Sequence, residues 1–294
     1  MQRKIKPVKR AGNGRFFLAA AALAGCGSPN DKTADGGAGV ADLSAAVDMA
    51  RAARDFAHVE LPTGGVKGVL FDEAGKPQPM VQILACNPSV CMYGTTGGDG
   101  SFQVDKLQLG GLAVKTQEDL TMMPARGEAI QPVLLTMQNV TVDIGKLYIP
   151  TLGPGGLLMG AEDMSMPQVI DAGDGVTLTV RRTDLDLPFG TPKKPALAAR
   201  LVPPERRPTL DVGGEKIVGT WALSPFETKS SSKVAVKVKL ALAANTEVHF
   251  RTISELNGAL SDPAIGHEAM DGLSAATDAN QGIDNLTWLI VTTK

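Results

Sequence analysis

Aromatic residues, cysteine and histidine are all scarce in this chain of 294 residues. Phe, Trp and Tyr together make up 4% of the sequence, and there are only three cysteines and three histidines. Glycine and proline are plentiful by contrast, with 33 and 19 residues. Few aromatics combined with many Gly and Pro residues favour short strands joined by tight turns over long helices. Because 43% of the residues are hydrophobic, the chain can still build packed cores and is not a disordered protein.

The chain also lacks a large excess of charge of either sign. Its formal net charge is −2, and a cluster of basic residues opens it: Arg3, Lys4, Lys6, Lys9, Arg10 and Arg15. If that opening is removed from the mature protein, the rest is mildly acidic. It then has no basic surface of the kind that nucleic-acid-binding proteins use. Nucleic acid is therefore not an expected partner.

No hydrophobic run is long enough to cross a membrane as a helix. The longest run near the start, residues 16–24, falls well short of the ~20 apolar residues that a spanning helix needs. A basic opening, a short apolar core and a small-residue end are typical of a secretory signal. We therefore predict a signal peptide over residues 1–25.

The residues that close this run, Leu23-Ala24-Gly25-Cys26, resemble the lipobox of bacterial lipoproteins. The resemblance implies that the signal is cut before Cys26 and that this cysteine receives a diacylglycerol, usually with a further acyl group such as palmitate on the new amino terminus. Stable anchoring takes more than one such chain. Gly27 in place of Asp favours the outer membrane. The alternative is an ordinary signal peptide, with Cys26 merely near the cut.

The stretch from residue 26 to residue 58 is expected to connect the anchor to the folded part. Residues 27–40 are polar and rich in Gly and Asp, as in a flexible tether. Apolar residues in 41–58 recur at roughly helical spacing, with Asp42 as a possible cap, which predicts a short helix. The alternative is further tether with only transient helix.

From Val59 onward the sequence changes to short strands separated by Gly and Pro. Strands are expected over 66–71, 81–86, 91–96, 101–104 and 112–116, with a tight turn at 97–100 that requires positive φ. Strands at this spacing predict an antiparallel β-sandwich.

Four segments carry a resemblance to a known family: Gly65–Pro77, Val81–Ile83, Thr95–Phe102 and Leu107–Gly111. They are similar to the carboxypeptidase regulatory-like domain, a transthyretin-like sandwich of seven strands. Gly97 departs from that pattern, since the family usually has Asp there. The resemblance covers about residues 62–120, and we place the first domain at 59–120. It implies a module without catalytic residues of its own, found in secreted peptidases and in many surface proteins.

Cys86 and Cys91 form an even pair if Cys26 is lipidated, and an even pair in an exported chain predicts a disulfide bond. They lie at facing ends of two predicted strands. In the chain-entropy model, closing so short a loop contributes about 2 kcal/mol. A metal or redox pair is the alternative, but a C-x₄-C spacing without a nearby His is a poor zinc site and is not C-x-x-C.

The remaining residues, 121–294, are expected to form a second β-rich domain. Val234, Val236 and Val238 alternate with polar residues, which predicts a strand with one wet face. Further strands are expected over 133–137, 140–144, 176–180, 197–202, 217–223, 234–242, 248–253 and 283–291. The pair at 133–144 fits either domain. The predicted fold class is all-β, with two antiparallel β-sandwich domains.

Motifs for catalysis are missing from the sequence. It has no H-E-x-x-H, no G-x-S-x-G and no phosphate-binding loop. We interpret His58, His249 and His267 as surface or rim residues and expect His267 to lie in a loop. Asp72, Asp99, Asp171 and Asp174 lie at expected turns and supply turn chemistry, and no D-x-[DN]-x-[DN]-G calcium loop exists. Neither a metal nor a cofactor is expected. Trp221, Trp288, Tyr93 and Tyr148 suit core packing better than a sugar-binding platform.

The sequence thus favours a lipid-anchored protein that is not an enzyme, held at the bacterial outer membrane. It would act in adhesion, glycan binding or envelope assembly, with the membrane and a glycan or envelope protein as partners. An accessory or degenerate subunit of a secreted hydrolase is the alternative, suggested by the carboxypeptidase resemblance. A scaffold without a ligand also remains open. The ligand-binding residues are not indicated by the sequence.

Overall fold

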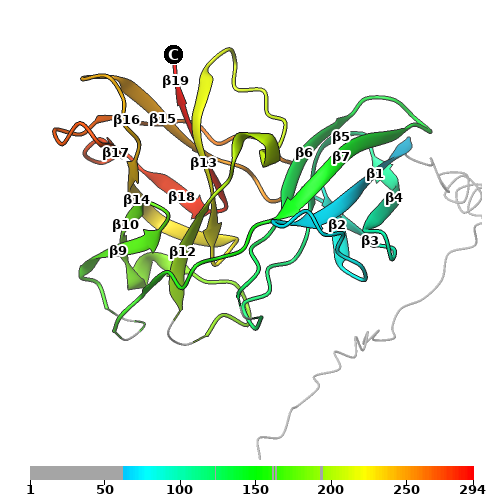
Figure 1. The fold of residues 1–294 in the computed structure, drawn as a ribbon, viewed down its shortest axis with the longest axis horizontal. Coiled ribbons are helices and arrows are strands. Elements are labelled where there is room, and N and C mark those ends of the chain that lie inside the picture. Colours follow the sequence, from blue (N-terminus) through cyan, green and yellow to red (C-terminus); the bar gives the residue numbers. More distant parts are fainter. Residues whose placement is uncertain (1–61, 123, 161, 163, 193–194) are drawn as a thin grey trace, which may run out of the picture. The chain divides into compact units, whose positions relative to one another are not determined.

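The computed structural model describes residues 62–294, apart from 123, 161, 163 and 193–194, and shows a nearly all-β protein (Figure 1). This confirms the all-β class. In the described part, the only helical elements are two 3₁₀ turns, η1 (Arg182–Asp184) and η2 (Pro204–Arg206). No helix there is long and apolar enough to cross a membrane. Cys26, the signal peptide, the tether and the helix expected within 41–58 lie outside the described residues.

The first seven strands form a sandwich of two sheets. They are β1 (Thr63–Asp72), β2 (Gln82–Cys86), β3 (Cys91–Thr95), β4 (Ser101–Gln108), β5 (Gly110–Lys115), β6 (Ile130–Leu135) and β7 (Thr141–Ile149). One sheet has the order β4-β1-β7 and the other β3-β2-β5-β6. Their facing sides bury a common core, to which Leu70, Ile83, Phe102 and Leu112 belong. Alternation along each strand puts every second side chain into this core.

Two local features set how these strands pair. Gly100 has φ +79°, and a Cβ there would lie 2.5 Å from the carbonyl oxygen of Leu70, so the predicted turn needs glycine at this position. β1 and β7 run parallel, so the expectation of purely antiparallel sheets is wrong at this pair. The connection into β7 crosses from the four-stranded sheet to the other sheet, and such a crossing does not impose the antiparallel order of a hairpin.

The segment around 133–144, which fitted either domain, belongs with the first sheets. β6 pairs with β5, and β7 pairs with β1. The boundary expected after residue 120 therefore falls between two neighbouring strands of one sheet. The described residues, from 62 to 294, form a single compact unit.

The second half of the chain forms one large sheet in place of two facing sheets, so the second sandwich is not confirmed. The sheet runs in the order β8-β12-β13-β19-β15-β16-β17-β14-β10-β9, with β11 and β18 also paired to β14. Its two edges approach closely, since a Cβ on Gly156 in β8 would lie 2.6 Å from the carbonyl oxygen of Asp171 in β9. The sheet is therefore a nearly closed barrel.

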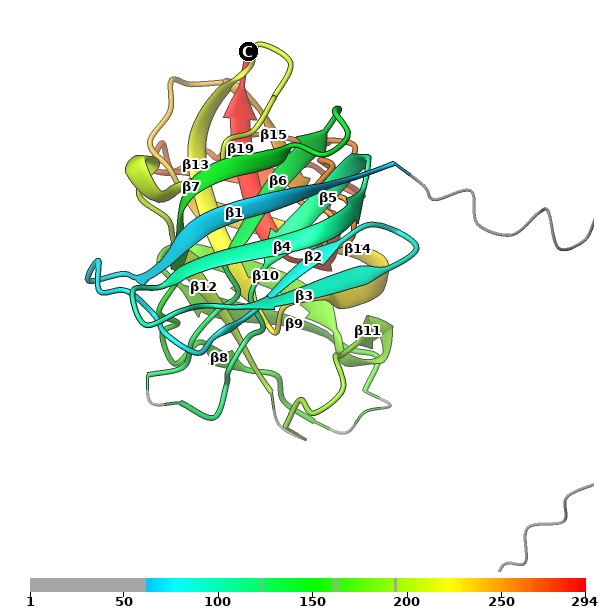
Figure 2. The same cartoon turned by 90° about the vertical axis from the view of Figure 1, so that its right-hand side faces the viewer.

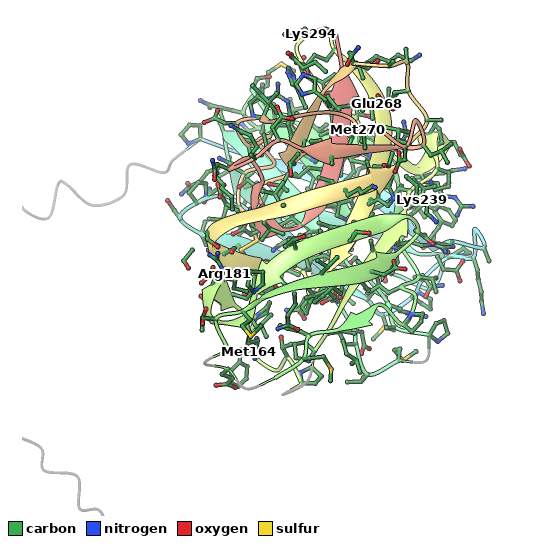
Figure 3. All side chains as sticks on the ribbon, turned by 90° about the vertical axis from the view of Figure 1, so that its left-hand side faces the viewer. Met164, Arg181, Lys239, Glu268, Met270 and Lys294 are labelled. Atoms are coloured by element: carbon green, nitrogen blue, oxygen red, sulfur yellow. A yellow bond between two sulfur atoms is a disulfide. The ribbon has the colours of Figure 1, made fainter. Side chains whose placement is uncertain are left out.

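The strands of this second sheet follow the sequence pattern in part. Val234, Val236 and Val238 are buried, as their alternation predicted. The strand expected over 283–291 is divided at Thr287 into two. The bounds are β8 (Gly156–Leu157), β9 (Pro167–Gly173), β10 (Val176–Arg181), β11 (Leu185–Asp186), β12 (Ala196–Leu201), β13 (Lys216–Ser224), β14 (Thr228–Lys239), β15 (Glu247–Thr252), β16 (Ala264–Glu268), β17 (Ser274–Thr277), β18 (Ile283–Leu286) and β19 (Trp288–Thr293). Figure 3 labels Arg181 and Lys239, the last residues of β10 and β14, on this side of the molecule.

The four-stranded sheet of the sandwich is covered on its outer face by the large sheet. Ala113 of β5 and Ile130 of β6 pack in one cluster with Ala222, Phe226 and Trp288. Figure 2 shows the three layers one behind another: β4-β1-β7 in front, then β2, β5 and β6, then β13 and β19. β5 is therefore buried on both faces.

Candidate functional site

A cleft of about 680 Å³ lies between the outer face of the four-stranded sheet and loops of the second half. Its floor includes Leu84 of β2, Lys115 of β5 and the disulfide bond between Cys86 and Cys91. Its walls come from the loop after β5, the turn between β13 and β14, and the loops after β11 and β15. A volume of this size is in the range of small-ligand sites.

Lys115 occupies the centre of the cleft because of the alternation in β5. Leu112 and Val114 enter the sandwich core, so Ala113 and Lys115 point to the opposite side, toward the second half. The residue is only 5% exposed. A buried ammonium group must be paired with an opposite charge to be tolerated. The sheet thus delivers one buried cation to the cleft.

The ammonium group of Lys115 is paired with two carboxylates. Its Nζ donates a hydrogen bond to Oε1 of Glu227, and lies 3.4 Å from Oε1 of Glu128. It also lies 5.3 Å from the ring centre of Phe226, within cation–π range. Burial alone would lower the pKa of Lys115, but Glu128 and Glu227 outweigh it and raise that pKa above its usual value. Lys115 is therefore held in its charged form.

Glu128 is the most deeply buried carboxyl group of the cleft, with a side chain only 6% exposed. Its position is fixed from behind, because Nε1 of Trp288 donates a hydrogen bond of 2.8 Å to its backbone oxygen. Within the described part of the chain, Oε1 of Glu128 accepts no hydrogen bond. Burial raises the pKa of Glu128 well above its usual value, against the opposing charge of Lys115.

Glu118, in the loop after β5, is a third carboxyl group in this cluster. Its Oε2 accepts a hydrogen bond of 3.1 Å from the backbone N–H of Phe226. Its Oε1 is buried and, among the described residues, has no hydrogen-bonding partner. Burial raises the pKa of Glu118 to about 7. Near neutral pH this group is poised between its neutral and its charged form.

Glu227 reaches Lys115 from an unusual backbone conformation. Its φ is +65°, in the left-handed region that non-glycine residues rarely adopt. The turn that carries it is closed by the hydroxyl of Thr228, which donates a hydrogen bond of 2.7 Å to the backbone oxygen of Pro225. Such strain is tolerated where the surrounding structure fixes it, often at functional sites.

Taken together, this cluster holds three carboxyl groups against a single ammonium group. Two of the carboxyl groups have raised pKa values, so the cluster can take up or release a proton near neutral pH. Each also has a buried oxygen without a hydrogen-bond donor from the described residues. A group that donates hydrogen bonds and carries positive charge would complement both properties.

An apolar pocket of about 420 Å³ adjoins the cleft, with Leu120 in the lining of both. Its wall includes Ser224 and Pro225, which directly precede the Phe226 of the cleft. Four prolines on other segments complete much of the surface: Pro124, Pro154, Pro192 and Pro195. The charged cluster therefore has an apolar surface immediately beside it.

The sequence placed a disulfide at Cys86 and Cys91, and the structure contains this bond, with an Sγ–Sγ distance of 2.07 Å. It joins the end of β2 to the start of β3 and lines the cleft. The other predicted site residue, Cys26, lies outside the described residues, as does His58. Over the described ranges, no three His, Cys, Asp or Glu residues are arranged to hold a metal ion.

The interpretation of His249 as a surface or rim residue is wrong. This side chain is buried, with Nδ1 at 2.7 Å from Oε1 of Glu215 and Nε2 at 3.0 Å from Oε1 of Glu247. Thr292 and Arg251 also contact Glu215, at 2.5 Å and 3.4 Å. Val248 and Phe250 enter the core, so His249 lies on the outer face of β15, where the side chains of Glu215 and Glu247 cover it. Glu215 comes from another segment, so the pattern of this strand alone cannot reveal the burial.

His267 belongs to β16 and not to a loop as expected from the sequence, and Nδ1 of its ring lies 2.9 Å from Oδ1 of Asp278. The side chain is 44% exposed, in agreement with a rim position. The hydrogen bond to Asp278 raises the pKa of His267. Neither His249 nor His267 lines the cleft.

The aromatic and aspartate residues singled out in the sequence do not converge on a site. Trp221 and Trp288 are each 2% exposed, so they pack in the core and cannot stack on a sugar. Tyr93 is exposed on β3, and Tyr148 on β7 packs against Phe71. The turn aspartates accept local hydrogen bonds or ion pairs: Asp72 from Lys76, Asp99 from Ser101, Asp171 from Gly173, and Asp174 from Leu201 and Arg200.

The residues of the cleft cluster, Lys115, Glu118, Glu128 and Glu227, were not identified from the sequence. They come from three segments separated by up to about a hundred positions, so no local spacing links them. One signal was available: Leu112, Ala113 and Val114 form an unbroken apolar run, which indicates a strand buried on both faces. A lysine that ends such a run has to be buried with a partner.

No family model and no curated protein matches this chain. Among solved structures, it is similar to fervidolysin from Fervidobacterium pennivorans, a keratinolytic enzyme related to subtilisin, at 12% identity and a TM-score of 0.21. The match covers 79% of this chain and 31% of that enzyme, so the chain spans about a third of the enzyme's length. A likeness this low carries no argument about fold or activity.

Proposed function

We propose that this is an exported, lipid-anchored protein of the bacterial envelope that binds a ligand or partner without catalysing a reaction. The cleft between the four-stranded sheet and the second half is the binding site. One observation carries the proposal. Buried carboxyl oxygens without hydrogen-bond donors among the described residues lie in residues of the cleft, and an apolar pocket adjoins it. That combination supplies both orientation and apolar contact, which is the general composition of ligand sites.

Further support comes from what holds the cluster. Lys115 and its carboxylates join the two halves of the folded part, as do Arg200 and Glu73, whose side chains form two hydrogen bonds of 2.8 Å each. The cleft is thereby built on rigid sheets, as a preformed site requires. The seven-stranded sandwich beneath it also fits the resemblance to carboxypeptidase regulatory-like domains, which serve as non-catalytic modules.

The anchor and the binding role need separate experiments. Mass spectrometry of the mature amino terminus should find a diacylated sulfur on Cys26, and Cys26→Ser should release the protein from the outer-membrane fraction. For binding, the mature chain in mild detergent should be applied to glycan and peptide arrays. An unmodified Cys26 contradicts the anchor, and an array without any retained ligand contradicts the binding role.

An accessory or degenerate hydrolase subunit is the second candidate. The specific observation in its favour is that Glu118 and Glu128 both have raised pKa values, as general acids do. Incubating the same peptides and glycans with the protein and analysing them by mass spectrometry separates the two functions. Cleavage that is lost in Glu118→Gln would favour the hydrolase, whereas recovery of intact ligand would favour binding.

A further inference from the structure

The cleft contains more buried acceptors than the described part of the chain has donors to satisfy. Its charged lining is made of five carboxyl side chains and two lysines: Glu118, Asp119, Glu128, Glu227, Glu255, Lys115 and Lys229. Lys229 pairs with Glu255 at 3.6 Å, and Asp119 accepts hydrogen bonds from Thr121. Lys115 is left to neutralise the other three carboxyl groups.

Lys115 cannot satisfy all of them. It donates its hydrogen bond to Glu227, and its Nζ lies 3.4 Å from Oε1 of Glu128, a long ion-pair contact that leaves this oxygen without a well-formed hydrogen bond. The buried Oε1 of Glu118 has no donor either from the described residues. A carboxyl oxygen that is buried without a hydrogen bond is costly, and such atoms in a native structure call for an explanation.

The surroundings of these two oxygens define what would fit. The residues that carry them line the cleft together with apolar side chains, among them Leu84, Leu120 and Phe226. Phe189 stands fully exposed in the lining, on the loop after β11. A ligand in this cleft would contact apolar surface as well as the carboxyl groups. Lysine and arginine side chains have this shape, with an apolar stem and a charged end.

We propose that the cleft binds an organic cation on an apolar stem, a primary ammonium or guanidinium group that donates hydrogen bonds to Glu128 and Glu118. This inference rests on the binding role proposed above and names the ligand class of the same site. The two sources of such a group are a basic side chain of a peptide and a free alkyl diamine. Lys115 does not oppose the cation, because its own charge is already engaged by Glu227.

The proposal has a consequence for protons. The charged groups that face the site are those of the lining given above, and burial raises the pKa of Glu118 to about 7 and the pKa of Glu128 well above its usual value. A bound cation favours the charged form of Glu118, so binding releases a proton near pH 7. Affinity should therefore rise from pH 6 to pH 8.

Binding can be measured by calorimetry with the mature chain in mild detergent. The probes are capped peptides Ala-Leu-X-Leu-Ala, with X as lysine, arginine, acetyl-lysine or norleucine, together with 1,5-diaminopentane. Peptides with lysine or arginine should bind at least about tenfold more tightly than those with acetyl-lysine or norleucine, as the loss of charged hydrogen bonds requires. Tighter binding of the diamine than of either basic peptide identifies a free amine as the ligand.

Matched variants test the residues. Glu128→Gln should lower the affinity for the lysine peptide at least about tenfold, and Glu118→Gln should reduce both the proton release and the pH dependence. Glu205→Gln, an exposed residue of η2 outside the cleft, is the control and should change neither. Because glutamine has nearly the shape of glutamate, circular dichroism should show that all three variants fold.

The outcomes separate this inference from the proposed function. Equal affinity for lysine and norleucine peptides, or no effect of either cleft variant, overturns the cation site. If an array ligand without positive charge binds instead and Glu128→Gln alters its affinity, the binding role stands and only the ligand class is wrong. If the lysine peptide binds and is then cleaved, the cation site stands and the non-catalytic role is wrong.

Discussion

At the scale of single residues, Glu227 shows a conflict between backbone and side chain. Its left-handed φ of +65° suits glycine, yet a glutamate stands there and pairs with the buried Lys115. A residue with a Cβ in this conformation costs about 1–2 kcal/mol. The ion pair is therefore retained although the backbone conformation of Glu227 is unfavourable.

Substitution of Glu227 can separate the two contributions. Glu227→Ala loses the ion pair and keeps the strained backbone, whereas Glu227→Gly loses the ion pair and relieves the strain. The free energy of unfolding, measured by chemical denaturation, should be about 1 kcal/mol higher for the glycine variant than for the alanine variant. At Glu205, in the ordinary conformation of η2, the same two changes should rank the other way. Equal stability of the two Glu227 variants would contradict strain at this position.

Glu118 predicts a pH dependence of stability. Burial raises its pKa from about 4.5 to about 7 in the folded state, so the folded state holds this proton more tightly than the unfolded state. The resulting stabilisation is fully present below about pH 4.5 and is lost as pH rises through 7. The unfolding free energy of the wild type relative to Glu118→Gln should fall by about 2 kcal/mol from pH 5 to pH 8, less than the whole shift because the side chain is partly exposed.

The comparison with Glu118→Gln also removes the contributions of other titrating groups. His267, whose pKa is raised by Asp278, loses its stabilisation over an overlapping range as pH rises, but it is present in both proteins. Chemical denaturation at four pH values provides the measurement. A constant difference between the two proteins across this range would mean that the pKa of Glu118 is not raised.

At the scale of elements, the sequence predicted what depends on neighbours along the chain. The alternation in β14 and the Gly-rich turn at Gly100 could be predicted because each depends only on residues that are close together in the sequence. The short strands β16 and β17 were missed because they lack alternation, and His249 was misplaced because its partners lie on other strands. The cleft could not be predicted for the same reason. The pattern of β5 is local, but its outer side also faces residues of the second half, such as Phe226 and Glu227.

β5 also provides a test of the buried ion pair. Lys115→Met leaves the charge of Glu128 without a partner between two layers, so at a pH where Glu128 is ionised it should destabilise the protein by about 3–5 kcal/mol. The loss should become smaller as the pH falls, because Glu128, whose pKa is raised, takes up a proton instead. The double variant Lys115→Met/Glu128→Leu removes both charges and should recover most of the stability. A double variant as unstable as the single one would show that the shape of these side chains matters more than their charge.

At the scale of the whole folded part, the seven-stranded sandwich and the large sheet share a buried interface. Ala113 and Ile130 lie in one apolar cluster with Phe226 and Trp288, and Trp288 also donates its hydrogen bond to Glu128 across the layers. Separating the halves would expose this cluster and leave the charges of the cleft uncompensated. We therefore expect the two halves to unfold together.

The chain carries its own probes for this prediction. Both tyrosines, Tyr93 and Tyr148, lie in the sandwich, and both tryptophans, Trp221 and Trp288, lie in the large sheet. Tyrosine absorbance and tryptophan fluorescence should therefore report the same midpoint of denaturant unfolding. Leu70→Ala, which opens a cavity in the sandwich core, should lower both midpoints equally, whereas Glu205→Gln should leave both unchanged. If Leu70→Ala shifts the tyrosine transition alone, the halves are independent domains, and the cleft between them is not held rigidly enough to be a preformed site.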